Sequence, residues 1–342
     1  MAGGALTSVK VVEFEGLGPA PFACMLLATH GAQITRIRRP GTVGGKGNST
    51  DQVIGRNRND IELDLKDKAA IETCLKLIAE ADVLVEGYRP GVMERLGLGP
   101  AAVAARNPRL VYARMTGWGQ SGPLADRAGH DINYLALSGG LSTIGPKERP
   151  HAPLNLVADF GGGGMYLVFG VLAAVLKARE TGEGAVIDCA MVDGVASLMS
   201  MIWGLRNDKR WVDERRANLL DGGCPFYDVY TCADGKFVAV GALEPQFYAK
   251  LVEVLKLTSL ADVQQYDKAA WPKIREALTA AFAKLTRAEA CALLEGVDAC
   301  VAPVLTMGEA PDHPHNKARG IYMEEAGGIV PALAPRMTPL KG

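Results

Sequence analysis

The feature that most constrains this chain is an alternation of short β-branched runs with helical segments up to residue 189. The runs predict strands at 9–14, 33–37, 61–65, 81–85, 110–115 and 185–189. Between and after them, helices are expected at 19–30, 68–80, 131–137, 165–179 and 191–205. Strands that alternate with helices in this way predict a mostly parallel, doubly wound (Rossmann-like) sheet, so the expected fold class is α/β.

The pattern changes after residue 218. Two β-rich runs at 227–232 and 237–240 flank Asp234-Gly235, a pair that suits a tight hairpin turn. Pro245 fits the first turn of a helix, and further helices are expected at 271–285 and 287–295. These elements predict a smaller α+β domain. The expected boundaries are a large domain at 1–189, a linker at 190–218, the small domain at 219–311, a second linker at 312–333, and a return to the large domain at 334–342.

Composition and charge limit the kinds of molecule and the environment that suit this protein. The net charge of −1 gives no overall field that would attract nucleic acid or an acidic membrane. The longest apolar run, 165–176, is too short to span a bilayer. The 7 cysteines are scattered and form no CxxC pair, which is typical of reduced thiols. We therefore expect a cytoplasmic protein.

Residues 31–60 depart from this charge balance. Their basic side chains are Arg36, Arg38, Arg39, Lys46, Arg56 and Arg58, against the acidic Asp51 and Asp60. Such a segment suits a polyanionic small ligand, and a solvated face is the alternative. The stretch 41–47 is rich in glycine but lacks the spacing of a phosphate-binding loop, so it is interpreted as a mobile loop.

Three positions carry the candidate chemistry. His130 lies where a glycine-rich loop meets a short helix, and Asp159 precedes Phe160, four glycines and an apolar helix. Glu244 stands directly before the helix that Pro245 opens. A helix-capping role is the alternative for each of them. The glycines after Asp159 exceed what capping requires, and they would let a ligand approach backbone N–H groups closely.

Other catalytic motifs do not fit the sequence. There is no GxSxG nucleophile motif, and Gly16-Leu17-Gly18 lacks the third glycine of a dinucleotide fingerprint. His313 and His315 lack further ligand residues apart from the neighbouring Asp312, so no metal site is expected.

Several longer strings occur in a fixed order around these positions. They are EGYRPGV at 86–92, RMTGWGQSGP at 114–123 and GHDINY at 129–134. With Asp159 and Glu244, they make the chain from about residue 8 to residue 337 resemble the α-methylacyl-CoA racemases of the family III CoA-transferase superfamily.

This resemblance implies a large α/β coenzyme A-binding domain and a small domain, joined by two linkers, in an interlocked homodimer. It implies that His130 and Asp159 are the acid/base pair, and that Glu244 orients the histidine. No cofactor is expected, because coenzyme A is part of the acyl-CoA substrate. The residues that the resemblance assigns to coenzyme A binding are Arg39, Leu63, Asp64, Leu65, Lys66, Gly87, Tyr88, Arg89, Arg95, Gly129, Asp131, Ile132, Asn133 and Tyr134.

The implied reaction is epimerisation of a 2-methylacyl-CoA by 1,1-proton transfer through an enolate. Two acid/base groups on opposite faces of the enolate would carry it, with backbone N–H groups at Asp131 or near Asp159 stabilising the oxyanion. The alternative is a family III CoA-transferase with Asp159 as nucleophile. His130 favours the racemase, because such transferases usually lack a histidine in this motif. A catalytically silent CoA-binding protein would have lost one of the three candidate residues. The sequence does not determine which acyl group the substrate carries.

Overall fold

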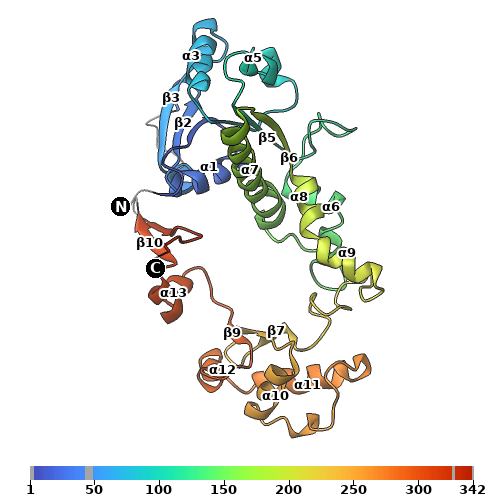
Figure 1. The fold of residues 1–342 in the computed structure, drawn as a ribbon. Coiled ribbons are helices and arrows are strands. Elements are labelled where there is room, and N and C mark those ends of the chain that lie inside the picture. Colours follow the sequence, from blue (N-terminus) through green and yellow to red (C-terminus); the bar gives the residue numbers. More distant parts are fainter. Residues whose placement is uncertain (1–3, 43–48, 326–327, 341–342) are drawn as a thin grey trace. The chain divides into compact units, whose positions relative to one another are not determined.

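The computed structural model describes residues 4–42, 49–325 and 328–340. The chain forms two units, which Figure 1 colours along the sequence. The first comprises Met1–Leu141, Ala152–Met201 and Gly320–Gly342, and the second comprises Ser142–His151 and Ile202–Arg319. Most of the stretch 41–47, interpreted from its sequence as a mobile loop, falls outside the described residues, and so does Lys46.

The first unit is built on a parallel sheet. Its strands are β1 (Lys10–Phe14), β2 (Gln33–Arg38), β3 (Arg58–Glu62), β4 (Val83–Glu86), β5 (Val111–Thr116) and β6 (Ala185–Ala190). Their order is β3-β2-β1-β4-β5-β6, that of doubly wound nucleotide-binding folds, so the predicted α/β class is confirmed. The strand order reverses between β1 and β4. The loops that follow these two strands therefore separate and open a crevice at the carboxyl edge of the sheet.

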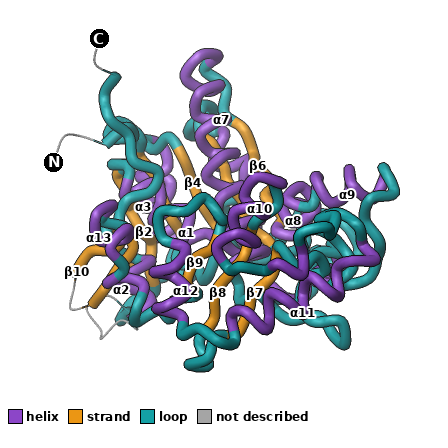
Figure 2. Tube along the Cα trace, turned by 90° about the horizontal axis from the view of Figure 1, so that it is seen from below, coloured by secondary structure: helices purple, strands orange, loops and turns teal. Residues whose placement is uncertain are grey.

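Helices cover both faces of this sheet. On one face lies α3 (Lys68–Ala79), whose Ile78 packs in one buried cluster with Leu84 of β4. Two helices cover the other face. They are α1 (Pro19–Thr29), which contacts β2 and β4, and α7 (Tyr166–Thr181), which contacts β5 and β6. Figures 1 and 2 show α7 running beside β6. The shorter helices are α2 (Ser49–Ile54), α4 (Val92–Arg95), α5 (Pro100–Ala104), α6 (Asp131–Leu137), α8 (Met191–Leu198) and α9 (Ser200–Asn207).

The strand predicted at 61–65 begins earlier, at Arg58. The hydrophobic pattern misses this start because Arg58 is a charged residue inside a strand. Its Nε donates to Glu13 Oε2 at 2.9 Å, and both side chains are fully buried. Burial raises the pKa of Glu13, and the neighbouring Arg58 opposes that rise. Arg58 Nη2 also donates to the carbonyl of Pro21 at 2.6 Å, so this buried pair fixes the first turn of α1.

A π-helix, Leu156–Met165, continues directly into α7. Asp159 therefore lies inside a helical segment and is not its N-cap, which corrects the capping interpretation. The continuous segment Leu156–Thr181 has 26 residues and is long and apolar enough to cross a bilayer, so the expectation drawn from 165–176 was wrong about its length. The segment contacts β5, β6, α1 and α8 within the first unit, but only 33% of its most apolar window is buried there.

Close helix packing explains the glycine run that follows Asp159. A Cβ added at Gly194 of α8 would lie 1.8 Å from the carbonyl oxygen of Gly162 in the π-helix. A Cβ at Gly164 would lie 2.6 Å from the ring of Phe22 in α1. The backbone of the π-helix thus approaches both α8 and α1 more closely than any side chain would allow. The run serves this packing, and the predicted approach of a ligand to its backbone stays a prediction.

The second unit has a small antiparallel sheet, β7-β8-β9. The predicted hairpin is confirmed, with Phe226, Tyr230 and Phe282 in the buried core behind it. The helix predicted at 191–205 is interrupted at Met199, between α8 and α9. The other elements of this unit are β7 (Tyr227–Thr231), β8 (Phe237–Gly241), β9 (Val301–Pro303), α10 (Pro245–Val254), α11 (Trp271–Phe282), α12 (Arg287–Leu294) and α13 (Pro314–Arg319). The strands β10 (Tyr322–Glu325) and β11 (Gly328–Pro331) belong to the first unit.

The close approach of α8 to the π-helix can be tested with two glycine substitutions. Gly194→Ala places a methyl group against the backbone of Gly162, so we expect the free energy of unfolding to fall by about 3 kcal/mol. Gly204→Ala is the control, because a Cβ at this helical position meets nothing within 4 Å. The control should be neutral or gain up to about 1 kcal/mol. Urea unfolding that gives both variants the same stability would contradict this account.

Candidate active site

A cleft of about 580 Å³ lies at the carboxyl edge of the parallel sheet. The loops after β1, β4 and β5 form its walls, which places it at the point where the strand order reverses. Both predicted acid/base residues, His130 and Asp159, line it. Its other lining residues are Leu17, Gly18, Pro19, Ala20, Gly87, Tyr88, Arg89, Pro90, Met115, Thr116, Gly117, Trp118, Ala125, Arg127, Ala128, Gly129, Tyr134, Asn155 and Met191.

His130 is the N-cap residue of α6, with extended backbone angles of φ −135° and ψ 172°. Its backbone N–H donates to Asn133 Oδ1 at 3.0 Å, which fixes the start of the helix. His130 as a whole is exposed, and it lines the cleft. The turn is thus held by backbone and Asn133, and it places His130 on the wall of the cleft.

Asp131 joins the two halves of the site. It is 6% exposed, and its Oδ2 accepts the backbone N–H groups of both Ala158 and Asp159 at 2.8 Å. The turn that carries His130 is therefore bonded directly to the π-helix that carries Asp159. These two N–H groups are occupied and are not free to donate to an oxyanion. The expectation of a donor at Asp131 or near Asp159 stays a prediction. The N–H of Asp131 itself, at the first position of α6, has no acceptor in the part of the chain that the structure describes.

The Asp159 carboxylate is half-buried, and burial raises its pKa. The hydrogen bond from Asn155 Nδ2 to Oδ2, at 3.2 Å, opposes this rise, the charge of Asp131 adds to it, and His130 lowers the pKa. The Oδ2 atom would be 3.4 Å from a Cβ at Gly18, which has a φ of +71°. A side chain at Gly18 would therefore meet the carboxylate.

An aromatic pair forms another wall of the cleft. The rings of Trp118 and Tyr134 meet edge to face with centroids 4.7 Å apart. A Cβ at Gly117 would lie 2.0 Å from the Tyr134 ring, and one at Gly129 would lie 2.7 Å from it. Burial and the charge of Asp159 both raise the pKa of Tyr134. Glycines in two of the motif strings thus let Tyr134 pack beside Asp159.

The structure places the residues assigned to coenzyme A in two groups. Those that line the cleft are Gly87, Tyr88, Arg89, Gly129 and Tyr134. Those that do not line it are Arg39 after β2, Leu63, Asp64, Leu65 and Lys66 after β3, Arg95 at the end of α4, and Asp131, Ile132 and Asn133 in α6. Residue 39 and residues 63–66 share the carboxyl edge of the sheet with the cleft. The side chains of Leu63 and Leu65 pack on the core, so only the backbone or their polar neighbours would face a ligand.

Most of the arginines in the basic segment at 31–60 form ion pairs or hydrogen bonds with other residues of the first unit. Arg36 pairs with Asp51 and Asp60 at 2.7 Å, and Arg38 pairs with Glu15 at 2.9 Å. Arg58 is bound to Glu13, as described above, and Arg56 bonds the carbonyl of Pro331 at 3.0 Å. The interpretation of the whole segment as a polyanion site was therefore wrong for these arginines. Arg39 stays a candidate, with an exposed side chain.

Glu244 lies in the second unit, at the N-cap position of α10. Its side chain is exposed and makes no capping hydrogen bond. The carboxylate is thus not used by its own helix. Its predicted bond to His130 stays a prediction.

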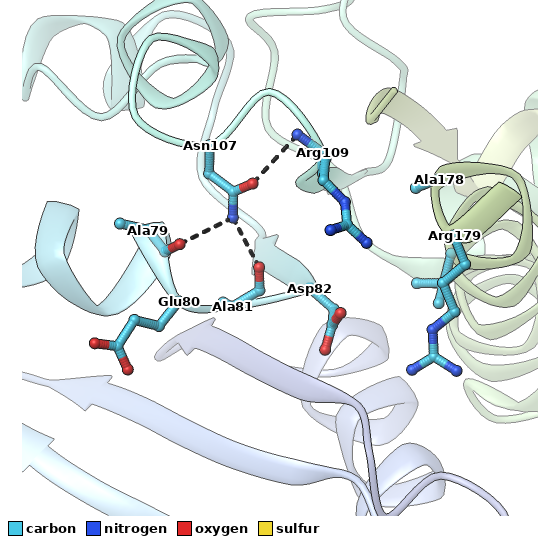
Figure 3. A pocket seen from close by; sticks show the side chains of 9 residues that line it. Ala79, Glu80, Ala81, Asp82, Asn107, Arg109, Ala178 and Arg179 are labelled. Atoms are coloured by element: carbon cyan, nitrogen blue, oxygen red, sulfur yellow. Dashed lines mark hydrogen bonds between the residues drawn. The ribbon is translucent and has the colours of Figure 1, made fainter. Parts of the chain in front are cut away.

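A smaller hollow of about 200 Å³ lies near the amino end of β4 (Figure 3). Its polar groups serve the fold, because Asn107 Nδ2 donates to the carbonyls of Ile78 at 3.1 Å and Ala81 at 2.8 Å, and Asp82 accepts the N–H of Lys10 at 2.8 Å. None of the predicted site residues lines it. Among the described residues, no three His, Cys, Asp or Glu side chains converge as metal ligands would.

Sequence reasoning missed several residues of the cleft. Gly18 was considered only as part of a failed dinucleotide motif, and Asn155 was given no role. Arg127 was not considered at all. The one available signal was the spacing of Asn155, four residues before Asp159, which places the two side chains on one side of a helix.

Comparisons with known proteins agree with this geometry. The model of CoA-transferase family III matches residues 6–339. An alpha-methylacyl-CoA racemase of Mus musculus is 46% identical over 336 residues, covering 98% of this chain and 86% of the racemase. The Homo sapiens alpha-methylacyl-CoA racemase is 46% identical over 333 residues, covering 97% and 86%. A solved CAIB/BAIF family protein from Brucella suis has a TM-score of 0.83 at 24% identity, over 98% of this chain and 93% of that one, and so shares the fold.

The two hydrogen bonds that Asp131 accepts predict a specific loss of stability when its carboxylate is removed. Asp131→Ala leaves the N–H groups of Ala158 and Asp159 without their acceptor, so we expect the free energy of unfolding to fall by roughly 2–4 kcal/mol. Asp126→Ala removes an exposed carboxyl from the same stretch of chain and should change stability by less than about 0.5 kcal/mol. Thermal or urea unfolding measures both. Equal stabilities for the two variants would show that the Asp131 bonds do not hold the site.

Proposed function

We propose, because the chain belongs to CoA-transferase family III, that its cleft binds a 2-methylacyl-CoA and inverts the configuration at the α-carbon. The observation that carries this proposal is the placement of His130 and Asp159 in one cleft, on two segments that Asp131 bonds together. A histidine and a carboxylate presented to the same space provide one group for each face of a planar enolate.

In this mechanism, neutral His130 removes the α-proton of one enantiomer while protonated Asp159 supplies a proton to the opposite face. The roles exchange for the other enantiomer. Asp159 must be protonated for part of the cycle, and the rise of its pKa through burial supports that role. No metal or redox cofactor is required in this scheme, because coenzyme A arrives with the substrate.

The enolate oxygen needs a hydrogen-bond donor, since acid/base catalysis supplies only about 10²–10⁴-fold. The N–H of Asp131 is the group we assign to this task, because it stands at the start of α6 beside His130. We further assign Glu244 to orient the imidazole and to stabilise its protonated form. The absence of a capping bond to the Glu244 side chain supports this assignment.

The coenzyme A phosphates require cationic partners. Arg89 and Arg127 line the cleft with exposed side chains. Among the residues that the structure describes, neither guanidinium has an ion-pair partner. Arg39 and Lys66 stand at the same edge of the sheet, and we propose that these four side chains bind the phosphates and the adenine end of the substrate.

The second candidate function is CoA transfer with Asp159 as nucleophile. The half-buried carboxylate beside a cleft would also suit that chemistry. His130 favours the racemase, because transferases of this family usually lack a histidine in this motif. Transfer would move coenzyme A to a free acid without exchange of the α-proton, so the two reactions have different products.

We also propose that the chain assembles as an interlocked homodimer in the cytoplasm. The support is an exposed apolar stripe along α7, where Phe169 is 72% and Leu176 is 69% exposed. Met165 precedes them at the same helical spacing, and Val186 of β6 is also exposed. A stripe of this kind is typical of a surface that another chain covers.

The proton-transfer proposal predicts α-deuterium uptake during epimerisation. Incubation of a single enantiomer of a 2-methylacyl-CoA in D₂O should give the other enantiomer with deuterium at the α-carbon. His130→Ala and Asp159→Ala should each lower the rate at least about 10²-fold, because each removes one acid/base group, while free coenzyme A still binds. Chiral chromatography with mass spectrometry measures both quantities. Transfer of coenzyme A to a free acid without α-exchange would establish the transferase instead.

The proposed subunit contact predicts a change of mass in solution. Phe169→Glu places a charge in the centre of the apolar stripe, so we expect a shift from dimer to monomer. Glu183→Gln, an exposed polar position beyond the end of α7, is the control and should stay dimeric. Light scattering after size exclusion measures the mass. A wild-type monomer, or binding of the wild type to lipid vesicles through this helix, would contradict the proposed contact.

A further inference from the structure

A buried cluster of charged side chains lies behind the wall of the cleft. Glu86, the last residue of β4, is 3% exposed, and Arg114 of β5 is also buried. Arg114 Nε lies 3.7 Å from Glu86 Oε1, and Arg114 Nη2 donates to Glu94 of α4. The proton-transfer mechanism uses none of these three residues. Glu94 is exposed, but burying Glu86 and Arg114 has a large desolvation cost.

The cluster holds two loops that line the cleft. Glu86 Oε2 accepts the backbone N–H of Tyr88 at 2.7 Å, in the loop that follows β4. Arg114 Nη1 donates to Gln120 Oε1 at 2.7 Å, in the loop that follows β5. The N–H of Gln120 in turn donates to Asp188 of β6 at 3.0 Å. One guanidinium therefore connects the loop that carries Tyr88 and Arg89 with the loop that leads to His130.

We propose that Glu86 is a positioning residue for substrate binding, whose carboxylate, held by Arg114, keeps the loop of Tyr88 and Arg89 in the conformation that binds coenzyme A. Glu86 lines no part of the cleft and touches no reacting atom, so it acts only through this loop. The inference rests on the proposed function, since it requires the cleft to bind an acyl-CoA.

The charge of Glu86 changes in the physiological range. Burial raises its pKa to about 7, against the lowering by the Tyr88 N–H and by Arg114, while Glu94 raises it further. The charged and titratable groups that face Glu86 are Arg114 and Tyr112 from β5, Glu94 from α4 and Tyr88 from its own loop. Above pH 7 the ionised carboxylate accepts a charge-assisted bond from the Tyr88 N–H and attracts the Arg114 guanidinium 3.7 Å away, and below pH 7 both interactions weaken. The loop of Tyr88 and Arg89 is therefore held most firmly above pH 7.

The test compares Glu86→Gln with the wild type at pH 8 and pH 6. Glutamine keeps the shape and an acceptor for the Tyr88 N–H but cannot ionise. At pH 8 we expect KM for the acyl-CoA to rise roughly three- to tenfold with kcat within about twofold, which corresponds to the loss of one charge-assisted bond. At pH 6 the ratio of the two KM values should approach about one, because the wild type is then neutral as well. Taking the ratio at each pH cancels the titration of the coenzyme A phosphates.

Glu72→Gln is the matched control. Glu72 is an exposed carboxylate on α3 that pairs with Arg106 at 3.3 Å, away from the cleft, and its removal should leave KM unchanged at both pH values. A Glu86→Gln enzyme with the wild-type KM at pH 8 would overturn the inference. So would a fall in kcat at unchanged KM, because that result would place Glu86 in the proton transfer or in the general stability of the site.

Calorimetric titration with free coenzyme A separates this inference from the proposed function. If the wild type shows no epimerisation, the proposed function fails, and weaker binding by Glu86→Gln at pH 8 but not at pH 6 would still support the role of Glu86 in the loop. If Glu86→Gln does not fold, Glu86→Asp decides. This variant keeps an ionisable group, so its binding should weaken as the pH falls from 8 to 6, and pH-independent binding would overturn the inference.

Discussion

The bonds from the Asp131 carboxylate to the N–H groups of Ala158 and Asp159 are the interaction on which the cleft depends. Asp131 follows His130 directly, so one buried group sets the distance between the two proposed acid/base residues. Racemisation needs that distance fixed, because both groups must reach opposite faces of one carbon atom. The strand order supports the arrangement, since the loops of the first unit diverge at the edge where this cleft lies.

The segments that Asp131 joins are rigid for separate reasons. The π-helix is held by glycines that allow its backbone to approach α8 and α1. The first turn of α1 is fixed by Arg58, which bonds Pro21 from a buried pair with Glu13. That turn places Gly18 against the carboxylate of Asp159. Buried charge and close backbone packing, neither of which contributes directly to catalysis, thus determine where the reactive groups stand.

The strand and helix periodicities predicted the parallel sheet and the hairpin of the second unit, because these elements have a regular apolar face. The start of β3 was missed because its side chains are buried as ion pairs, a pattern that hydrophobicity does not reveal. No local signal distinguishes a π-helix from a glycine-rich cap, so Asp159 was placed at the wrong kind of position. His130 and Asp159 were predicted through motif order, and the structure places both in one cleft. Gly18 and Glu86 act through neighbours that only the fold brings close.

The stereochemical course of solvent deuterium tests the central claim most directly. One enantiomer of a 2-methylacyl-CoA is turned over in D₂O at low conversion, and the label is measured separately in the inverted product and in the remaining substrate. Two groups on opposite faces predict that the inverted product carries deuterium, because its new proton comes from a different group than the one that removed the old proton. An inverted product that keeps the original protium would show a single group moving one proton between faces, and it would contradict the assignment of His130 and Asp159 as a pair.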